Sequence, residues 1–288
     1  MKKKQKIHHE ASESDKQILE ILRASADRVG CEPLWLKANK LPQVQITEST
    51  SSNGPVVLLL HGLFGAVSNW DGVFNRFAAF CRPIAVKFPL LTGHKTEIGI
   101  KSLALLTEAF IRSRGYENVL ICGNSLGGHV GLRLTLASPQ LVKGLVLAGT
   151  SGLYEHTVDS LPLRPDHRFV REHMSKVFFN QALVTEDAIM EVAEILKTRK
   201  HVLNLVQAAK SAKKDNLQKL LPIVNQKTLL LWGEEDTVTT MEVAHQFKDL
   251  MPNSRLVTMK GCGHAPMIEH PEWFSAQVES FFREQNWL

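Results

Sequence analysis

The sequence predicts an α/β protein in which helices cover both faces of a parallel sheet. Its short apolar runs are continuous, as expected for strands that are buried on both faces. These runs alternate with segments of helical periodicity, an order typical of parallel strands joined by right-handed crossovers. The chain has 288 residues, of which 44% are hydrophobic and 22% charged, so it can form one large soluble domain with an inserted sub-domain.

The apolar runs and the segments between them give the expected order of elements. Six strands are predicted, at residues 56–60, 83–88, 119–122, 145–148, 228–232 and 255–259. Helices are predicted at about 69–80, 100–113, 126–137 and 240–250, and after Pro271. Sites in such sheets form at the carboxyl ends of the strands, so the chemistry should lie in the loops directly after these runs.

Residues 1–30 form an N-terminal extension that precedes the alternating region. Five of its apolar residues have roughly helical spacing: Ile18, Leu19, Ile21, Leu22 and Val29. We expect a short amphipathic helix that lies against the main domain.

Residues 153–221 form an insertion without a clear strand, and 186–213 are largely helical in pattern. The insertion leaves and re-enters the core at the carboxyl-end side of the sheet. We therefore expect a helical cap over the site, the alternative being extra helices packed beside the sheet. Residues 31–152 and 222–288 then form the core.

The charge distribution does not favour a nucleic-acid partner. Part of the formal net charge of +5 comes from a basic tip made of Lys2, Lys3, Lys4 and Lys6. Such a tip can touch nucleic acid or anionic lipid. No aromatic residue interleaves with these lysines, however, and the chain has no nucleic-acid-binding motif. We interpret the tip as a solvated terminus.

Cysteine usage and hydropathy favour a cytoplasmic protein. The four cysteines are far apart and lack the spacing of a zinc site, and a reduced setting fits them best: Cys31, Cys81, Cys122 and Cys262. No apolar region follows the N-terminal lysines as it would in a secretory signal. No stretch is long and apolar enough to span a bilayer.

The strongest chemical signal is the Gly-Asn-Ser-Leu-Gly-Gly run at residues 123–128, directly after a predicted strand and at the start of a helix. This is the G-x-S-x-G nucleophile elbow in its expected context. The turn should hold Ser125 in a strained conformation that exposes its hydroxyl. Gly123 and Gly127 should let neighbouring backbone approach closely. The positive end of the helix dipole favours an oxyanion here.

A second run, His-Gly-Leu-Phe-Gly at residues 61–65, follows the first predicted strand. An oxyanion hole needs two N–H donors, one from the residue after the nucleophile and one from this loop. We assign them to the backbones of Leu126 and Leu63. His61 is expected to tie the loop down by hydrogen bonding.

A base and an acid are expected after the last two predicted strands. Asp236 ends a Gly-Glu-Glu-Asp run, and His264 ends a Gly-Cys-Gly-His run. A serine hydroxyl needs a base near neutral pKa, and the acid fixes the tautomer of that base. Glu234 and Glu235 are interpreted as solvated loop charges. The chain order Ser125, Asp236, His264 is that of an α/β-hydrolase.

From about residue 33 to its end, the chain resembles the α/β-hydrolase superfamily. The similarity is clearest at residues 229–236 around the acid and 261–272 around the histidine. The resemblance implies the α/β-hydrolase fold, with an eight-stranded, mostly parallel sheet and a helical cap. One departure is that residues 88–96 keep Gly93-His94 but lack the aspartate that many members have after the second strand. His94 is expected to be structural.

Hydrolysis of a carboxylic ester or related acyl substrate through an acyl-enzyme is the plainest interpretation. Carbon–carbon bond hydrolysis of a ring-cleavage product is the alternative, since Asn124 and residues 184–187 resemble that group, whereas Ala265 replaces a tryptophan common there. Acyl transfer, thioester hydrolysis and a non-catalytic ligand-binding homologue also stay open.

The substrate is expected to be a small, partly apolar molecule. Five residues of the insertion are apolar enough to line a pocket or form the cap's own core: Phe169, Met174, Val177, Phe178 and Phe179. Phe64 is a further candidate, and Arg168 or Arg171 could bind a substrate carboxylate. We expect no cofactor and no metal, and the oligomeric state stays open.

Overall fold

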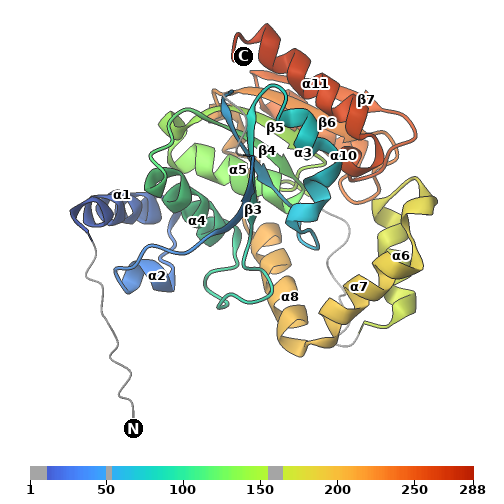
Figure 1. Ribbon diagram of the computed structural model, residues 1–288, viewed down its shortest axis with the longest axis horizontal. Helices are drawn as coiled ribbons and strands as arrows, with labels where there is room; N and C mark the ends of the chain where they lie inside the picture. The colour runs from blue at the N-terminus through green and yellow to red at the C-terminus, as the bar shows by residue number, and fades with distance from the viewer. Residues whose placement is uncertain (1–11, 50–53, 155–164) are drawn as a thin grey trace.

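The computed structural model describes residues 12–49, 54–154 and 165–288 (Figure 1). The basic tip at Lys2–Lys6 lies outside the described residues. Seven strands form one sheet: β1 (Gln45–Glu48), β2 (Val56–Leu60), β3 (Arg82–Lys87), β4 (Val119–Asn124), β5 (Val142–Ala148), β6 (Lys227–Gly233) and β7 (Ser254–Met259). All six predicted strands are therefore confirmed, with β5 beginning three residues earlier than expected.

The strand order is β1-β3-β2-β4-β5-β6-β7. All neighbours pair in parallel except β1, which runs antiparallel to β3 at one edge. The resemblance implied eight strands, whereas the described residues form seven. The sequence did not predict β1, because this edge strand is half exposed and alternates in burial, so it has no continuous apolar run.

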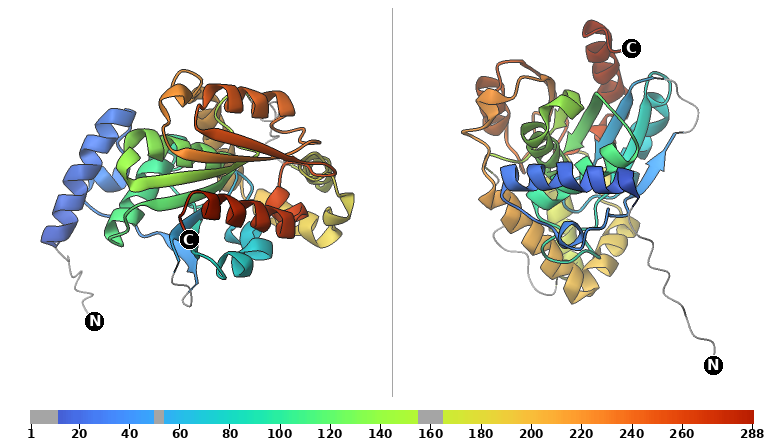
Figure 2. Two further views of the ribbon diagram at one scale, coloured as in Figure 1. Left: turned by 90° about the horizontal axis from the view of Figure 1, so that it is seen from above. Right: turned by 90° about the vertical axis from the view of Figure 1, so that its left-hand side faces the viewer.

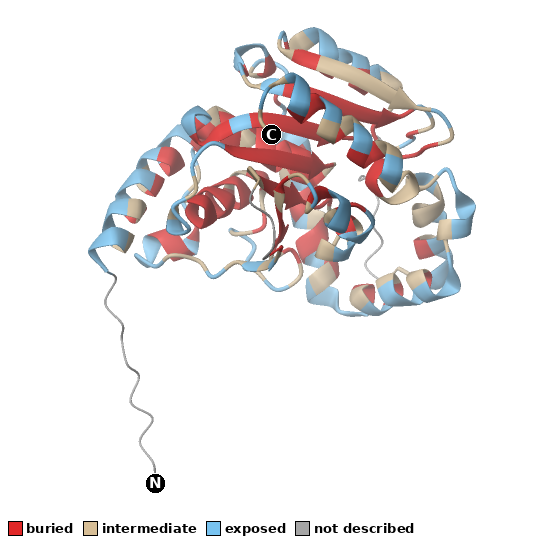
Figure 3. Cartoon of the chain, turned by 45° about the horizontal axis from the view of Figure 1, so that its top comes forward, coloured by how far each residue is buried: buried red, intermediate tan, exposed pale blue. Residues whose placement is uncertain are grey.

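Helices cover both faces of the sheet (Figure 2). The helices after the N-terminal region and outside the insertion are α3 (Asp71–Phe77), α4 (Ile100–Ser113), α5 (Leu126–Ala137), α9 (Met241–Leu250), α10 (Pro266–Glu269) and α11 (Pro271–Glu284). One core packs α4, α5 and α9 against the sheet, and the other packs α3 and α11. Figure 3 shows the central strands almost wholly buried between these layers.

The N-terminal extension forms α1 (Glu13–Val29), followed by the short α2 (Leu34–Lys37). As expected, α1 is amphipathic and packs on the main domain. Leu22 and Ala26 contact Leu105 and Ala109 of α4 within one buried cluster. Ile21 was expected on this face but is 42% exposed. The helix lies at the end of the molecule away from the insertion (Figure 2).

The insertion between β5 and β6 contributes α6 (His167–Val177), α7 (Glu186–Lys197) and α8 (Arg199–Lys214). Its return point is fixed to α5, because Arg133 donates to both oxygens of Asp215 at 2.9 and 2.6 Å. His129 Nε2 lies 2.9 Å from the carbonyl of Asp215. Burial alone would raise the pKa of Asp215, but hydrogen bonds from His129 and Arg133 lower it overall.

Candidate active site

Ser125 stands on a sharp turn between β4 and α5. Its backbone has φ 53° and ψ −121°, a strained region for a residue with a side chain. Such a conformation costs about 1–3 kcal/mol and persists only where surrounding contacts enforce it. Here Ser125 N–H donates to Ala148 on β5, and Ser125 C=O accepts from His129 and Ser151. The predicted strain at this serine is thus confirmed.

The glycines beside Ser125 are required by close backbone contacts. A Cβ on Gly127 would lie 2.0 Å from the carbonyl oxygen of Leu60 at the end of β2. A Cβ on Gly123 would lie 2.6 Å from the nitrogen of Gly128. Neither contact is possible for a real side chain, so the elbow can form only with glycine at both positions.

The loop after β2 lies against this elbow. A Cβ on Gly62 would be 3.3 Å from the Cβ of Ser125, so the next residue, Leu63, is beside the serine. Leu126 is the first residue of α5, where N–H groups have no intrahelical acceptor. Both residues line the same cavity as Ser125.

His61 holds this loop to the sheet, as the sequence predicted. Its Nε2 accepts from Phe88 N–H at 3.1 Å, so the proton is on Nδ1, which donates to Gly62 C=O at 2.8 Å. Burial lowers the pKa of His61 to about 4, with Lys87 adding to the effect. The imidazole is therefore neutral and structural.

Asp236 and His264 come together after β6 and β7. The Nδ1 of His264 lies 2.8 Å from Asp236 Oδ2, and both side chains are buried. The other carboxylate oxygen, Oδ1, accepts from the N–H groups of Val238 and Thr239 at 2.8 and 2.9 Å, and the Thr239 hydroxyl donates to Oδ2 at 3.0 Å. The imidazole of His264 is therefore hydrogen-bonded to a carboxylate whose orientation is fixed by three further hydrogen bonds.

Two glutamates, Glu235 and Glu269, accept hydrogen bonds from backbone N–H groups of the loop that carries His264. Glu235 was expected to be a solvated charge, but its carboxylate accepts from Cys262 N–H at 3.0 Å. Glu234 is exposed, although it accepts from Thr258 at 2.9 Å. Glu269 accepts from Gly263 N–H at 2.7 Å and also from Asn180 N–H in the insertion at 2.9 Å. These carboxylates replace backbone partners that an irregular loop lacks.

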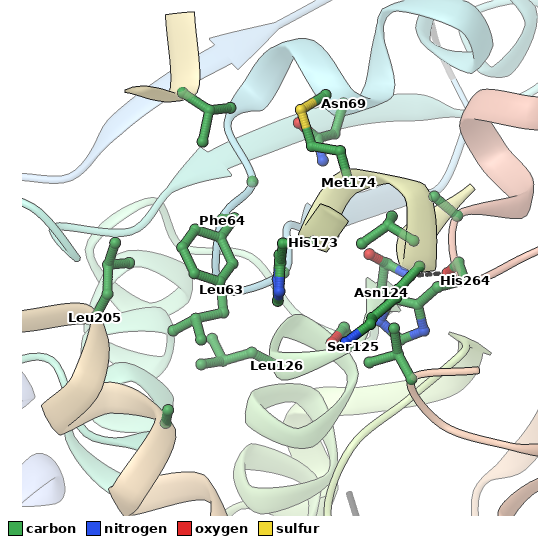
Figure 4. Close-up of a pocket in the computed structure, with 18 of the residues that line it drawn as sticks. Leu63, Phe64, Asn69, Asn124, Ser125, Leu126, His173, Met174, Leu205 and His264 are labelled. Carbon is green, nitrogen blue, oxygen red and sulfur yellow. Dashed lines mark hydrogen bonds between the residues drawn. The ribbon is translucent and has the colours of Figure 1, made fainter. Parts of the chain in front are cut away.

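A cavity of about 300 Å³ contains Ser125 and His264 on one wall (Figure 4). Its wall from α7 and α8 is apolar, formed by Val192, Leu196, Leu205, Val206, Ala209 and Ala212. Among the described residues, its lining includes no arginine and no carboxylate. The cavity therefore suits a mainly apolar molecule with polar groups close to Ser125.

The structure brings some of the substrate-contact candidates to this cavity. Phe64 and Phe178 line it, together with Phe169, Met174 and Val177. Two other candidates, Arg168 and Phe179, do not line it. The side chain of Arg168 is 86% exposed and pairs with Glu172, and Phe179 is 52% exposed, outside the cavity.

The outward direction of Arg168 follows from the phase of α6. The residues of this helix that face the cavity are 169, 170, 173, 174, 176 and 177, whereas Arg171 pairs with Glu186 outside. The helix ends at Val177, so the helical period does not determine the direction of the Phe179 side chain.

His94 is exposed and makes a local contact of 2.9 Å with Thr96, in agreement with a structural role. The loop around it is tied to the insertion, because Asn204 of α8 donates to the carbonyls of Leu91 and Gly93. This contact holds the loop against α8.

The sequence did not predict the structural roles of two polar residues that line the cavity, His173 and Asn124. His173 of α6 extends into the cavity and packs against the Phe64 ring at 4.9 Å. Its position four residues after Phe169 could have indicated this. Asn124 donates to the carbonyls of Ala148 and His264, both at 3.0 Å, and so joins the elbow to the histidine loop.

The described residues contain no cluster of three or more histidine, cysteine, aspartate or glutamate side chains arranged to hold a metal ion. Cys262, beside His264, is buried, and burial raises the pKa of its thiol, with the nearby Glu269 adding to the effect. The described part of the chain has no helix with the length and hydropathy needed to cross a bilayer.

Comparison with known proteins decides the family. The model of the alpha/beta hydrolase family matches residues 57–277. The chain belongs to the α/β-hydrolase family. A pimeloyl-[acyl-carrier protein] methyl ester esterase from Nitrosomonas europaea is 30% identical over 242 residues, covering 78% of this chain and 94% of the esterase.

Two further proteins show how varied its relatives are. A 2-hydroxy-6-oxo-6-(2'-aminophenyl)hexa-2,4-dienoic acid hydrolase from Metapseudomonas resinovorans is 30% identical over 243 residues, covering 79% of this α/β-hydrolase and 83% of the relative. The crystal structure of MGS-MChE2, an α/β-hydrolase enzyme from a sediment metagenome, matches with a TM-score of 0.66 and 31% identity. It covers 85% of this chain and 100% of the other.

Proposed function

We propose that this α/β-hydrolase cleaves a carboxylic ester or related acyl substrate, with Ser125 as nucleophile, His264 as base and Asp236 as the orienting acid. One observation carries the proposal. A strained serine at the start of α5 shares a cavity with a histidine whose far nitrogen is fixed by a buried carboxylate at 2.8 Å. This arrangement supports nucleophilic catalysis through an activated hydroxyl.

In the proposed reaction, Ser125 Oγ attacks the carbonyl carbon while its proton passes to Nε2 of His264. Asp236 accepts a hydrogen bond from Nδ1–H of His264 and stabilises the imidazolium that forms. The backbone N–H groups of Leu63 and Leu126 hold the oxyanion, assisted by the positive end of α5. The proton then passes to the leaving alcohol, and an acyl-enzyme remains. Water activated by His264 releases the acid and restores Ser125.

We assign residues 153–221 to a cap that closes the cavity, although 155–164 lie outside the described residues. Support comes from α6, α7 and α8, which together supply much of the cavity lining. The apolar wall of α7 and α8 would hold the apolar part of the substrate, and Phe64 and Phe178 would contact it nearer to the serine. Burial of apolar area there contributes roughly 25 cal/mol per Å² to binding.

Carbon–carbon hydrolysis is the second candidate, favoured by the 30% identity to the dienoic acid hydrolase. Substrates of that kind carry a carboxylate. Arg168 and Arg171, which could have bound it, are paired with glutamates outside the cavity. Lys176 is the cationic side chain that remains on the lining. The missing arginine makes ester hydrolysis the better-supported reaction.

The test compares the intact protein with Ser125→Ala. We expect hydrolysis of p-nitrophenyl esters and labelling by a fluorophosphonate, with the label on the peptide that contains Ser125 and none on Ser151, the other serine of the cavity. Ser125→Ala should lower kcat by at least about 10³-fold. A 2-hydroxy-6-oxo-dienoate is assayed in parallel, and its faster turnover would establish the second candidate.

Two outcomes would contradict the proposal. Label on Ser151 and persistent hydrolysis by Ser125→Ala would assign another nucleophile. A folded protein with neither labelling nor turnover would indicate a ligand-binding homologue. Labelling with turnover of thioesters alone would keep the nucleophile but change the substrate.

A further inference from the structure

The cavity presents one polar side chain that the proposed reaction does not use. His173 lies on α6 and faces inward with Phe169 and Met174. Figure 4 shows its ring extending into the cavity between Phe64 and the group formed by Ser125 and His264. It is close enough to His264 for the charge of one to affect the other.

Among the described residues, two aromatic rings pack against His173. The Phe64 ring contacts it edge-on, with 4.9 Å between the ring centroids. The Phe169 ring stacks on it, with 6.0 Å between the centroids and 15° between the ring planes. Neither ring nitrogen has a hydrogen-bond partner among the described residues. The side chain is partly buried and lines the cavity, so these nitrogens are open to a molecule bound there. A polar group in this position is suited to bind a ligand.

The chemistry of His173 limits what this ligand group can be. Burial lowers the pKa of His173, and the charge of Lys176, and that of His264 when it is protonated, lower it further, which favours the neutral ring. A neutral imidazole offers one N–H donor and one acceptor nitrogen. An ester or ketone carries oxygen acceptors, so the donor is the useful group here.

Two other polar side chains of the lining, Asn124 and Asn69, make contacts within the protein, whereas Lys176 is exposed. The amide group of Asn124 donates to the carbonyls of Ala148 and His264. The side-chain oxygen of Asn69 accepts from Ala66 N–H. The oxyanion is assigned to backbone donors. His173, which points into the cavity from the side of the insertion, is placed to donate to an additional oxygen on the substrate.

We propose that His173 is a specificity-determining residue that donates a hydrogen bond to a second oxygen of the substrate, separate from the scissile carbonyl. The inference rests on the proposed hydrolase function. It narrows the substrate to an acyl compound that combines an apolar portion with an oxo, hydroxyl or carboxylate oxygen a few bonds from the scissile bond. The apolar portion lies on the wall formed by α7 and α8.

The test is the ratio of kcat/KM for matched substrates. Oxo esters are compared with plain esters of the same chain length: p-nitrophenyl 4-oxopentanoate with pentanoate, and 5-oxohexanoate with hexanoate. A p-nitrophenyl hemiester of glutarate provides the carboxylate. His173→Phe keeps an aromatic ring between Phe64 and Phe169 but removes both nitrogens. A ratio within one protein does not depend on the fraction that is folded.

The wild type should favour at least one oxygen-bearing ester over its plain counterpart. His173→Phe should reduce that preference about tenfold, as expected for one hydrogen bond, and should change kcat/KM for the plain esters much less. His173→Leu, a second variant in case the first fails to fold, should reduce it similarly.

A preference that survives in both variants, or its absence from the wild type for every ester, would overturn the role of His173 and leave the proposed function standing. Failure of the proposed function is distinct, because then the intact protein neither hydrolyses plain esters nor takes the fluorophosphonate label. In that case the inference falls with it.

Discussion

Acid should destabilise this α/β-hydrolase through a residue that takes no part in the proposed reaction. His61 is buried in its neutral form, with a pKa lowered from 6.5 to about 4. In the unfolded chain the imidazole takes up a proton near pH 6.5, whereas in the folded chain it does so only near pH 4. Stability is therefore full above pH 6.5 and falls as the pH drops from there through 4.

The expected loss follows from the two pKa values. A difference of about 2.5 units corresponds to roughly 3 kcal/mol of unfolding free energy lost by pH 4. His61→Gln keeps an acceptor for Phe88 N–H but does not titrate. This variant should be less stable than the wild type at pH 8 and should show a flatter dependence on pH.

Urea denaturation followed by tryptophan fluorescence at several values between pH 8 and pH 4 measures this difference. His94→Gln is the matched control, because His94 is exposed and its loss should leave the wild-type pH dependence intact. His173 and Asp215, with lowered pKa values, act in the same direction in every variant, so the comparison isolates His61. Parallel curves for the wild type and His61→Gln would refute the reasoning.

Three further predictions concern the site and its supports. Asp236→Asn should lower kcat by ~10³–10⁴-fold, since the wrong tautomer of His264 is favoured, and a loss below about tenfold in an ester assay would contradict the proposed role. Arg133→Ala should cost about 3 kcal/mol in urea denaturation because it removes both guanidinium hydrogen bonds from the buried carboxylate of Asp215 and leaves His129 as its partner, whereas Arg168→Ala, at an exposed pair, should change little. Gly127→Ala should lower the free energy of unfolding by more than about 3 kcal/mol or abolish folding, because its Cβ would lie 2.0 Å from the carbonyl oxygen of Leu60. A melting temperature within about 2 °C of the wild type would show that the elbow can relax.

The sequence predicted those parts of the fold that a continuous apolar run or a regular helical period marks. Helices 100–113 and 126–137 have the predicted bounds. The loops after β4, β6 and β7 carry the predicted residues because parallel strands end at one edge of the sheet. Strand β1 was missed for the opposite reason, since Gln45 and Thr47 face solvent at the sheet edge.

The substrate side of the site was harder to predict, because it depends on how helices of the insertion are rotated. Charge suggested Arg168, but the apolar period of α6 turns this residue outward and His173 inward. Glu235 was missed because its partner, Cys262 N–H, lies on a loop 27 residues away. Such contacts follow from tertiary packing, which a local pattern does not encode.

The helix α6 connects substrate selection to the position of the proposed base. Its last residue, Val177, accepts the backbone N–H of His264 at 2.8 Å, and Glu269 joins Gly263 to Asn180 just beyond the helix. His173 lies on the same helix, one turn before Val177. A shift of α6 that admits a larger substrate would therefore also move His264 away from Asp236, so kcat would fall as KM changed. The wall formed by α7 and α8 lines the cavity with apolar side chains, and substitutions at Leu205 or Ala209 should change chain-length preference with the reaction centre intact.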